Sequence, residues 1–178
     1  MSSNTMPPPP LPPYHPPTIP SPELKSHIDE ALITDGYFND YIYKKHHPQD
    51  LHAAIRYLAP RIQPMKSELV NVSNQLKLAF QSAQDSAKQA GNSQLAMSLQ
   101  IQAAMSDASL HVIETVHVPP EEQLRRADSR DACLFLTKLI LQIHSGEASI
   151  RGTKKKIEEL GRGEVEGGFE QKVGVRRF

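Results

Sequence analysis

The sequence predicts an all-α fold, a helical bundle built on a long antiparallel, coiled-coil-like hairpin at residues 64–118. Two apolar stripes, one on each side of Gly91-Asn92, carry this prediction, and a third apolar run follows at residues 132–143. Apolar residues that recur every three or four positions lie on one face of an α-helix. The sequence shows no strand pattern, so helices should build the whole core.

The first arm of the hairpin has small or apolar residues at alternating intervals of four and three, which is the spacing of a heptad seam. These residues are Met65, Leu69, Val72, Leu76, Ala79, Ala83, Ser86 and Ala90. A sustained repeat of 3.5 residues keeps a seam turned toward a partner helix. The side chains become smaller toward Gly91, so we expect the helix axes to approach more closely at that end. Gly91 suits a left-handed C-cap, and Asn92 or Ser93 can cap the second arm.

The second arm has a broader apolar stripe that covers two sides of a helix. It comprises Leu95, Met97, Leu99, Ile101, Met105, Val112, Ile113 and Val116. A helix that is apolar on two sides needs two neighbours, so we expect this arm to lie inside a bundle. Charges are sparse between Glu68 and Asp107, which leaves two interpretations open. Either this is an ordinary bundle helix of low charge, or its Gln-, Ser- and Asn-rich face is also covered, by another copy or another protein.

A third long helix is predicted at residues 120–144. Pro120 and the two glutamates after it suit a helix start, and His144-Ser145-Gly146 suits a helix end. Its stretch from Ala132 to Ile143 is apolar nearly all round, so we expect it to be the most buried helix and to pack on the hairpin.

The remaining segments are shorter or of low complexity. Residues 1–22 form a proline-rich arm that we expect to be disordered, with polyproline II bias. Residues 23–60 predict two or three short helices, of which the first is capped by Ser21 and the second runs through Tyr37 and Tyr41. Residues 61–63 are predicted to be a linker, and residues 147–178 a polar helix followed by a flexible, glycine-rich tail.

The composition limits the possible functions. With 178 residues, of which 38% are hydrophobic, one core of moderate size is feasible. The net charge is zero and the pI is about 7.1, so no global charge favours nucleic acid or an anionic membrane. The single cysteine, Cys133, lies in an apolar run and should be a buried, inert thiol. No signal peptide or membrane-spanning run is evident, so we expect an intracellular protein of the cytoplasm or nucleus.

No catalytic or cofactor motif is present, so we expect neither an enzyme nor a bound cofactor. The sequence has no phosphate-binding loop, nucleophile elbow or His-Glu-x-x-His motif. His46, His47 and His52 are close in sequence, but a helical pair of metal ligands needs a spacing of three or four, and His47 and His52 are five apart. We therefore predict no metal site and interpret Asp50 as a helix cap.

The expected function is that of a non-catalytic helical subunit or adaptor of a multiprotein complex, acting through packing with partner helices or through self-association. The residues expected to act by burial in this seam are Leu69, Val72, Leu76, Leu99, Ile101, Phe135 and Leu139.

Two alternatives belong to other classes. The first is a small nucleic-acid-associated factor of transcription or chromatin, which would use Tyr43-Lys44-Lys45, Lys154–Lys156 and the basic tail. The patch around Tyr43 has Lys44, Lys45 and Arg56 as its cations, and so few charges give only weak phosphate binding. The second is a scaffold whose proline-rich arm recruits a profilin-, WW- or EVH1-type domain. The arm resembles polyproline ligands, and its residues Pro10, Leu11, Pro12, Pro13 and Tyr14 include a variant of the PPxY motif with leucine at the first position.

Overall fold

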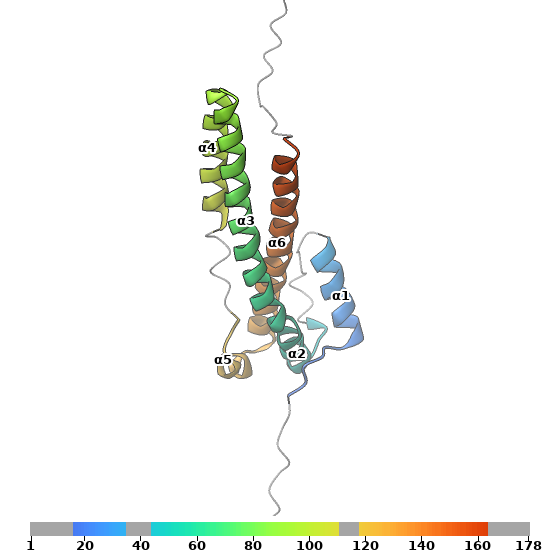
Figure 1. The fold of residues 1–178 in the computed structure, drawn as a ribbon. Helices are drawn as coiled ribbons and strands as arrows, with labels where there is room; N and C mark the ends of the chain where they lie inside the picture. Colours follow the sequence, from blue (N-terminus) through green and yellow to red (C-terminus); the bar gives the residue numbers. More distant parts are fainter. Residues whose placement is uncertain (1–15, 35–43, 111–117, 164–178) are drawn as a thin grey trace, which may run out of the picture.

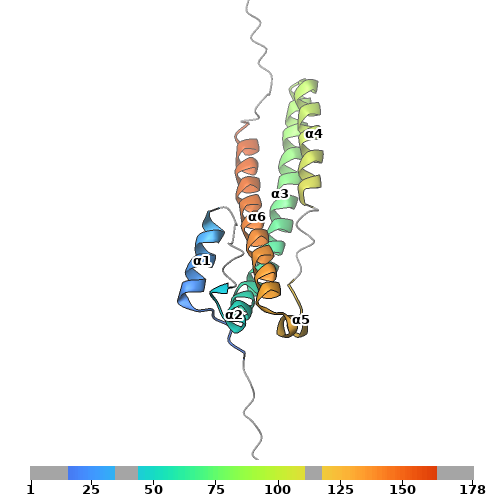
Figure 2. The same cartoon turned by 180° about the vertical axis from the view of Figure 1, so that it is seen from behind.

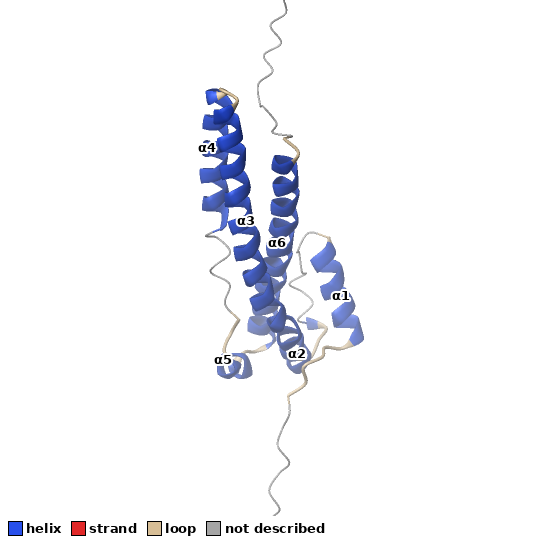
Figure 3. Ribbon diagram, viewed as in Figure 1, coloured by secondary structure: helices blue, strands red, loops and turns tan. Residues whose placement is uncertain are grey.

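The computed structural model describes residues 16–34, 44–110 and 118–163, and every regular element in these ranges is helical (Figures 1 and 3). The all-α prediction is therefore confirmed. The elements are α1 (Pro22–Ile33), α2 (Pro48–Leu58), the short 3₁₀ helix η2 (Ala59–Arg61), α3 (Ile62–Gln89), α4 (Ser93–Leu110), α5 (Glu121–Arg126) and α6 (Ser129–Gly161).

Some predictions fall outside the described residues. They concern the proline-rich arm with its motif Pro10–Tyr14, the helix expected through Tyr37 and Tyr41, the end of the second arm from Val112 to Val116, and the glycine-rich tail.

Helices α3 and α4 form the predicted antiparallel hairpin (Figure 1). Gly91 has a φ of 73°, in the left-handed region that glycine adopts without strain. The amide of Leu95 donates a hydrogen bond of 3.0 Å to Oδ1 of Asn92. The turn residues therefore end one helix and start the next as their chemistry predicts.

The predicted linker at residues 61–63 is wrong, because this segment is helical. Helix α2 continues through η2 into α3 without leaving helical geometry. Pro60 lies in the first turn of η2 and Pro64 lies in the first turn of α3. Proline fits the first turn of a helix, where its missing N–H is not needed, and a short 3₁₀ segment commonly joins helices.

The single helix predicted at residues 120–144 starts where expected, since Pro120 caps α5, but the prediction is wrong about its continuity and its end. The chain leaves helical geometry at Ala127, whose backbone is extended, and Asp128 then caps a new helix by accepting a 2.8 Å hydrogen bond from the amide of Asp131. This helix, α6, continues through Gly146 and ends only at Gly161. The sequence pattern at His144-Ser145-Gly146 resembled a helix end because glycine is common there.

Two clusters of buried side chains form the core. The lower one joins α1, α2, the start of α3, α5 and the first half of α6. The upper one joins the second half of α3, α4 and the end of α6. Only α3 and α6 contribute buried residues to both, and α6 lies between α1 and the hairpin in both views of the ribbon (Figures 1 and 2). The prediction that residues 132–143 pack on the hairpin is thus confirmed, and Cys133 is buried.

Gly146 on α6 lies against the side chain of Met65 on α3. A Cβ atom at this position would overlap Sδ and Cε of Met65 on α3. Glycine is thus present for its lack of a side chain, because it lies in helical backbone and its conformational freedom is not used. Gly152, one and a half turns later, has open space where a Cβ would be.

The exposure of α6 differs from the prediction in one respect. Leu134 is 45% exposed and Leu141 is 49% exposed, so one side of this helix faces solvent in the described structure. Among the described helices, none combines the length and the apolar character that a bilayer crossing requires.

These two glycines provide a test of the packing. We expect Gly152→Ala to raise the free energy of unfolding by about 1 kcal/mol, because alanine has the higher helix propensity. We expect Gly146→Ala to lower it by about 1 kcal/mol, because overpacking against Met65 outweighs the same gain. Urea denaturation followed by circular dichroism measures both. An equal gain in the two variants would show that Met65 moves aside freely.

Candidate functional site

The outer face of α4 is apolar and uncovered. Met97 is 65% exposed, Ile101 is 56% exposed and Met105 is 69% exposed. They are spaced by four residues and so lie along one side of the helix. Leu99, fully buried against α3, is two residues from Met97 and from Ile101, which is about 200° around the helix axis. The prediction that α4 is apolar on two sides is therefore right, but within the described structure only one side is covered.

No charged residue occurs in α4 between Ser93 and Ser106. A surface helix normally carries charged residues on its outer face, which keep it soluble and disfavour association. Here the outer face instead combines three large apolar side chains with Gln, Ser and Ala. This surface, defined by Met97, Ile101 and Met105, is called the outer stripe of α4 below.

Most of the residues predicted to bind a partner are buried in the chain's own core. Five of them are at most 7% exposed, namely Leu69, Val72, Leu76, Leu99 and Leu139. Phe135 is half-buried against the lower cluster. The reason is that α6 covers the seam of α3 that the sequence left open. The structure therefore does not bring the seven residues to one surface, and Ile101 is the member of the set that lies on the outer stripe.

A hollow of about 450 Å³ lies at the tip of the hairpin, beside the end of α6. Small side chains line its α3 wall, among them Ala79, Ala83 and Ala87. No charged residue lines this hollow, so its walls provide mainly apolar contacts. The small residues of the seam thus leave space at the tip.

In the described structure, two basic residues of the nucleic-acid alternative are paired with glutamates. Nζ of Lys154 lies 2.7 Å from a carboxylate oxygen of Glu68, and Nζ of Lys155 lies 3.7 Å from one of Glu159. The ion pair with Lys154 lowers the pKa of Glu68. Tyr43 and the basic tail lie outside the described residues.

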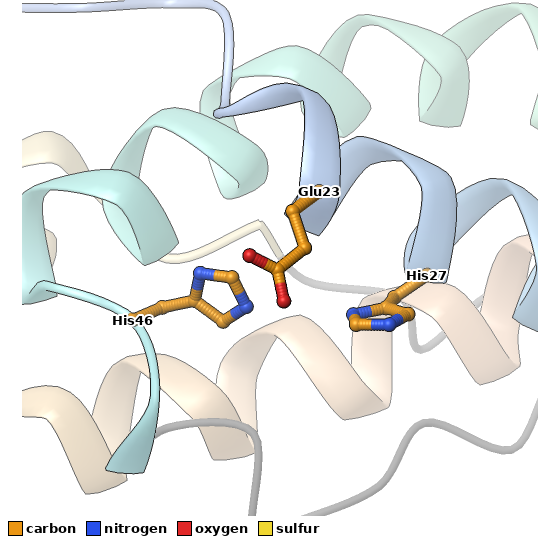
Figure 4. Close-up of side chains that lie close together, drawn as sticks. All are labelled: Glu23, His27 and His46. Carbon is orange, nitrogen blue, oxygen red and sulfur yellow. The ribbon is translucent and has the colours of Figure 1, made fainter.

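A cluster of three metal-ligand types occurs where α1 meets the segment before α2. Glu23 and His27 lie one turn apart on α1, and His46 comes from the other side (Figure 4). One potential ligand atom from each lies within 4.8 Å of the other two. The rings of His27 and His46 meet edge to face, with centroids 6.4 Å apart. Nδ1 of His27 and Nε2 of His46 are buried and have no hydrogen-bond partner.

Asp50 supports this cluster from behind. Its carboxylate accepts hydrogen bonds of 2.6 Å from both the amide and the hydroxyl of Ser21, and it lies 3.3 Å from Nδ1 of His46. The prediction that Asp50 caps α2 is therefore wrong. His47 caps α2 instead, since its Nδ1 accepts from the amide of Gln49. Asp50 is turned toward α1 because Ser21, the cap of α1, offers two donors.

The three histidines considered in the sequence do not meet. His47 caps α2, His46 joins Glu23 and His27, and Nε2 of His52 lies 3.2 Å from the carbonyl oxygen of Ala127. Burial lowers the pKa of His52, and the charge of Arg56 lowers it further. Sequence reasoning missed the cluster because its third member, His46, comes from the segment before α2, which is distant from α1 in the sequence. The signal was nevertheless present, since Glu23 and His27 have the spacing of four that suits two ligands on one helix face.

Arg56 connects α2 to α5. Its guanidinium donates hydrogen bonds of 2.6 Å and 3.2 Å to the two carboxylate oxygens of Glu121. These bonds lower the pKa of Glu121. The side chain that the sequence suggested for phosphate binding is thus engaged within the fold.

Comparison with known proteins identified no relative: no family model, curated protein or solved structure matches this chain.

His52 generates a pH-dependent prediction. Its lowered pKa means that the unfolded chain binds a proton more readily than the folded one, so stability is full above the usual value of about 6.5 and falls as the pH drops through it. We expect His52→Gln, which keeps a donor for Ala127, to reduce the loss of unfolding free energy between pH 7.5 and 5.5. Urea titrations at several pH values measure this slope. An unaltered slope in His52→Gln would contradict the assignment.

Proposed function

We propose that this chain is a non-catalytic helical subunit or adaptor of a multiprotein assembly inside the cell, and that it binds a helix of another protein on the outer stripe of α4. The observation that carries the proposal is the exposure of Met97, Ile101 and Met105 on a helix segment without charge. Nothing in the described structure covers this face.

The spacing of the outer stripe favours a helical partner. Side chains at intervals of four residues present a straight apolar row about 12 Å long, from Met97 to Met105, which is the pattern that an amphipathic helix matches. Methionine is flexible and packs against varied shapes. The lack of charge between Ser93 and Ser106 means that the partner face must be uncharged too, because a charge buried there would be unpaired.

The opposite face of α4 packs in the core and holds the outer stripe in place. Leu99 is fully buried and Ala96 is 7% exposed, and both belong to the upper cluster with Phe80 and Leu160. A helix held in this way keeps its outer side chains in register before the partner arrives, which reduces the entropic cost of binding.

The two alternative functions expected from the sequence, a nucleic-acid-associated factor and a proline-arm scaffold, are still predictions. The proline-rich motif Pro10–Tyr14 lies outside the described residues. For the nucleic-acid alternative, the pairing of Lys154 and Lys155 with glutamates reduces the free positive charge. Neither therefore has a specific structural observation in its favour.

The test is a charge placed on the outer stripe. We expect Ile101→Asp to weaken partner binding at least tenfold, because burial of an unpaired carboxylate at a helix interface costs more than about 1.4 kcal/mol. Circular dichroism and the melting temperature should stay unchanged, since Ile101 is 56% exposed. Tagged full-length chain purified from its native cells gives the partner and its molar ratio.

The control is Ser26→Asp, which puts the same charge on an exposed position of α1, a helix that α6 separates from the hairpin (Figure 1). This variant, and a chain lacking residues 1–20, should keep the partner. An unchanged partner set in Ile101→Asp would refute the docking surface. A purified chain that is a dimer and becomes a monomer in Ile101→Asp would instead make the occupant a second copy.

A further inference from the structure

We infer that Glu23, His27 and His46 form a zinc site that fastens α1 to the start of α2. The inference is independent of the partner surface on α4. It begins with two buried ring nitrogens, Nδ1 of His27 and Nε2 of His46, that have no hydrogen-bond partner. A buried polar atom without a partner is costly, so such atoms in a folded protein call for an explanation.

His46 is the anchor of the site. Its side chain is only 5% exposed, and its ring points toward the Glu23 carboxylate and His27 (Figure 4). The ring is fixed from the other side, where Nδ1 lies 3.3 Å from the Asp50 carboxylate. With the proton on Nδ1, the lone pair of Nε2 faces Glu23 and His27. Such a carboxylate behind a histidine sets the ring orientation and raises the basicity of a metal ligand.

The geometry is close to that of a bound ion. Donors of a tetrahedral zinc ion, at bond lengths of about 2.1 Å, lie about 3.4 Å apart. The three potential ligand atoms lie within 4.8 Å of one another, so small side-chain rotations suffice. Glu23 is exposed and His27 half-buried, which leaves room for these rotations and keeps the fourth position open to water.

The donor set selects the metal. Two imidazoles and one carboxylate suit zinc and other late transition metals, whereas calcium and magnesium prefer oxygen donors only. Ser21 holds the Asp50 carboxylate in turn, because its amide and its hydroxyl both donate hydrogen bonds to Asp50. The ion thus joins two elements that are 19 residues apart between His27 and His46 and adds to the apolar packing of α1.

The experiment uses untagged full-length chain stripped of metal with a chelator and titrated with Zn²⁺ in competition with a chromophoric chelator. We expect one ion per chain and a rise in melting temperature of roughly 5 °C at a zinc concentration a hundredfold above Kd. Cobalt in place of zinc should give the absorption of a tetrahedral nitrogen and oxygen site. Glu23→Gln and His27→Gln should each weaken binding at least tenfold, and Asp50→Asn should weaken it by about 10- to 100-fold.

The controls are Glu30→Gln, an exposed carboxylate elsewhere on α1, and His47→Asn, which keeps a residue suited to capping α2. Both should bind zinc like the original chain, and so should Ile101→Asp. Circular dichroism of the unloaded variants separates loss of a ligand from loss of fold. The inference is overturned if no stoichiometric ion binds, or if Glu23→Gln and His27→Gln, with helicity unchanged, bind as tightly as their controls.

Discussion

The packing of α6 along α3 is the constraint on which the rest of the structure depends. The two buried clusters are separate, and the side chains of α3 and α6 are the ones that reach both. Gly146 on α6 lies against the side chain of Met65 on α3, which would have to shift to admit a Cβ atom in this rotamer. Interiors pack at the density of organic crystals, so a contact of this kind fixes the relative position of two helices along their length.

This packing also decides which surface is left for other molecules. Because α6 occupies the seam of α3, Leu69 and Val72 are buried inside the chain. Within the described residues, helix α4 packs on α3 and the end of α6 with one apolar face, and Met97, Ile101 and Met105 on the other face are exposed. A helix segment without charge that is apolar on two sides supports the proposal that another molecule covers its outer face. The proposed docking surface exists because the described helices cover one apolar face of α4 and not the other.

At the end of the molecule that contains α1, α2 and α5, polar contacts between helices add to the apolar packing of the lower cluster. Asp50 joins Ser21 to His46, His52 faces Ala127, and Arg56 holds Glu121. Beneath these contacts lies an apolar layer in which Leu24 and Ile28 are fully buried. Polar groups at such a junction specify one orientation of the helices, since each donor needs its own acceptor. The proposed zinc site would extend this junction by using the two ring nitrogens that it leaves without partners.

The sequence by itself determined the helical class, the hairpin turn at Gly91 and the apolar stripes, because spacing and turn chemistry act over a few neighbouring residues. It also predicted that α4 is apolar on two sides, and Glu23 and His27 at a spacing of four were visible in it. The tertiary structure alone decided whether Gly146 would end a helix or allow a close approach, where Asp50 would turn, and that His46 would meet α1. These outcomes depend on which segments meet in space, and local propensity contains no information about a partner that is distant in sequence.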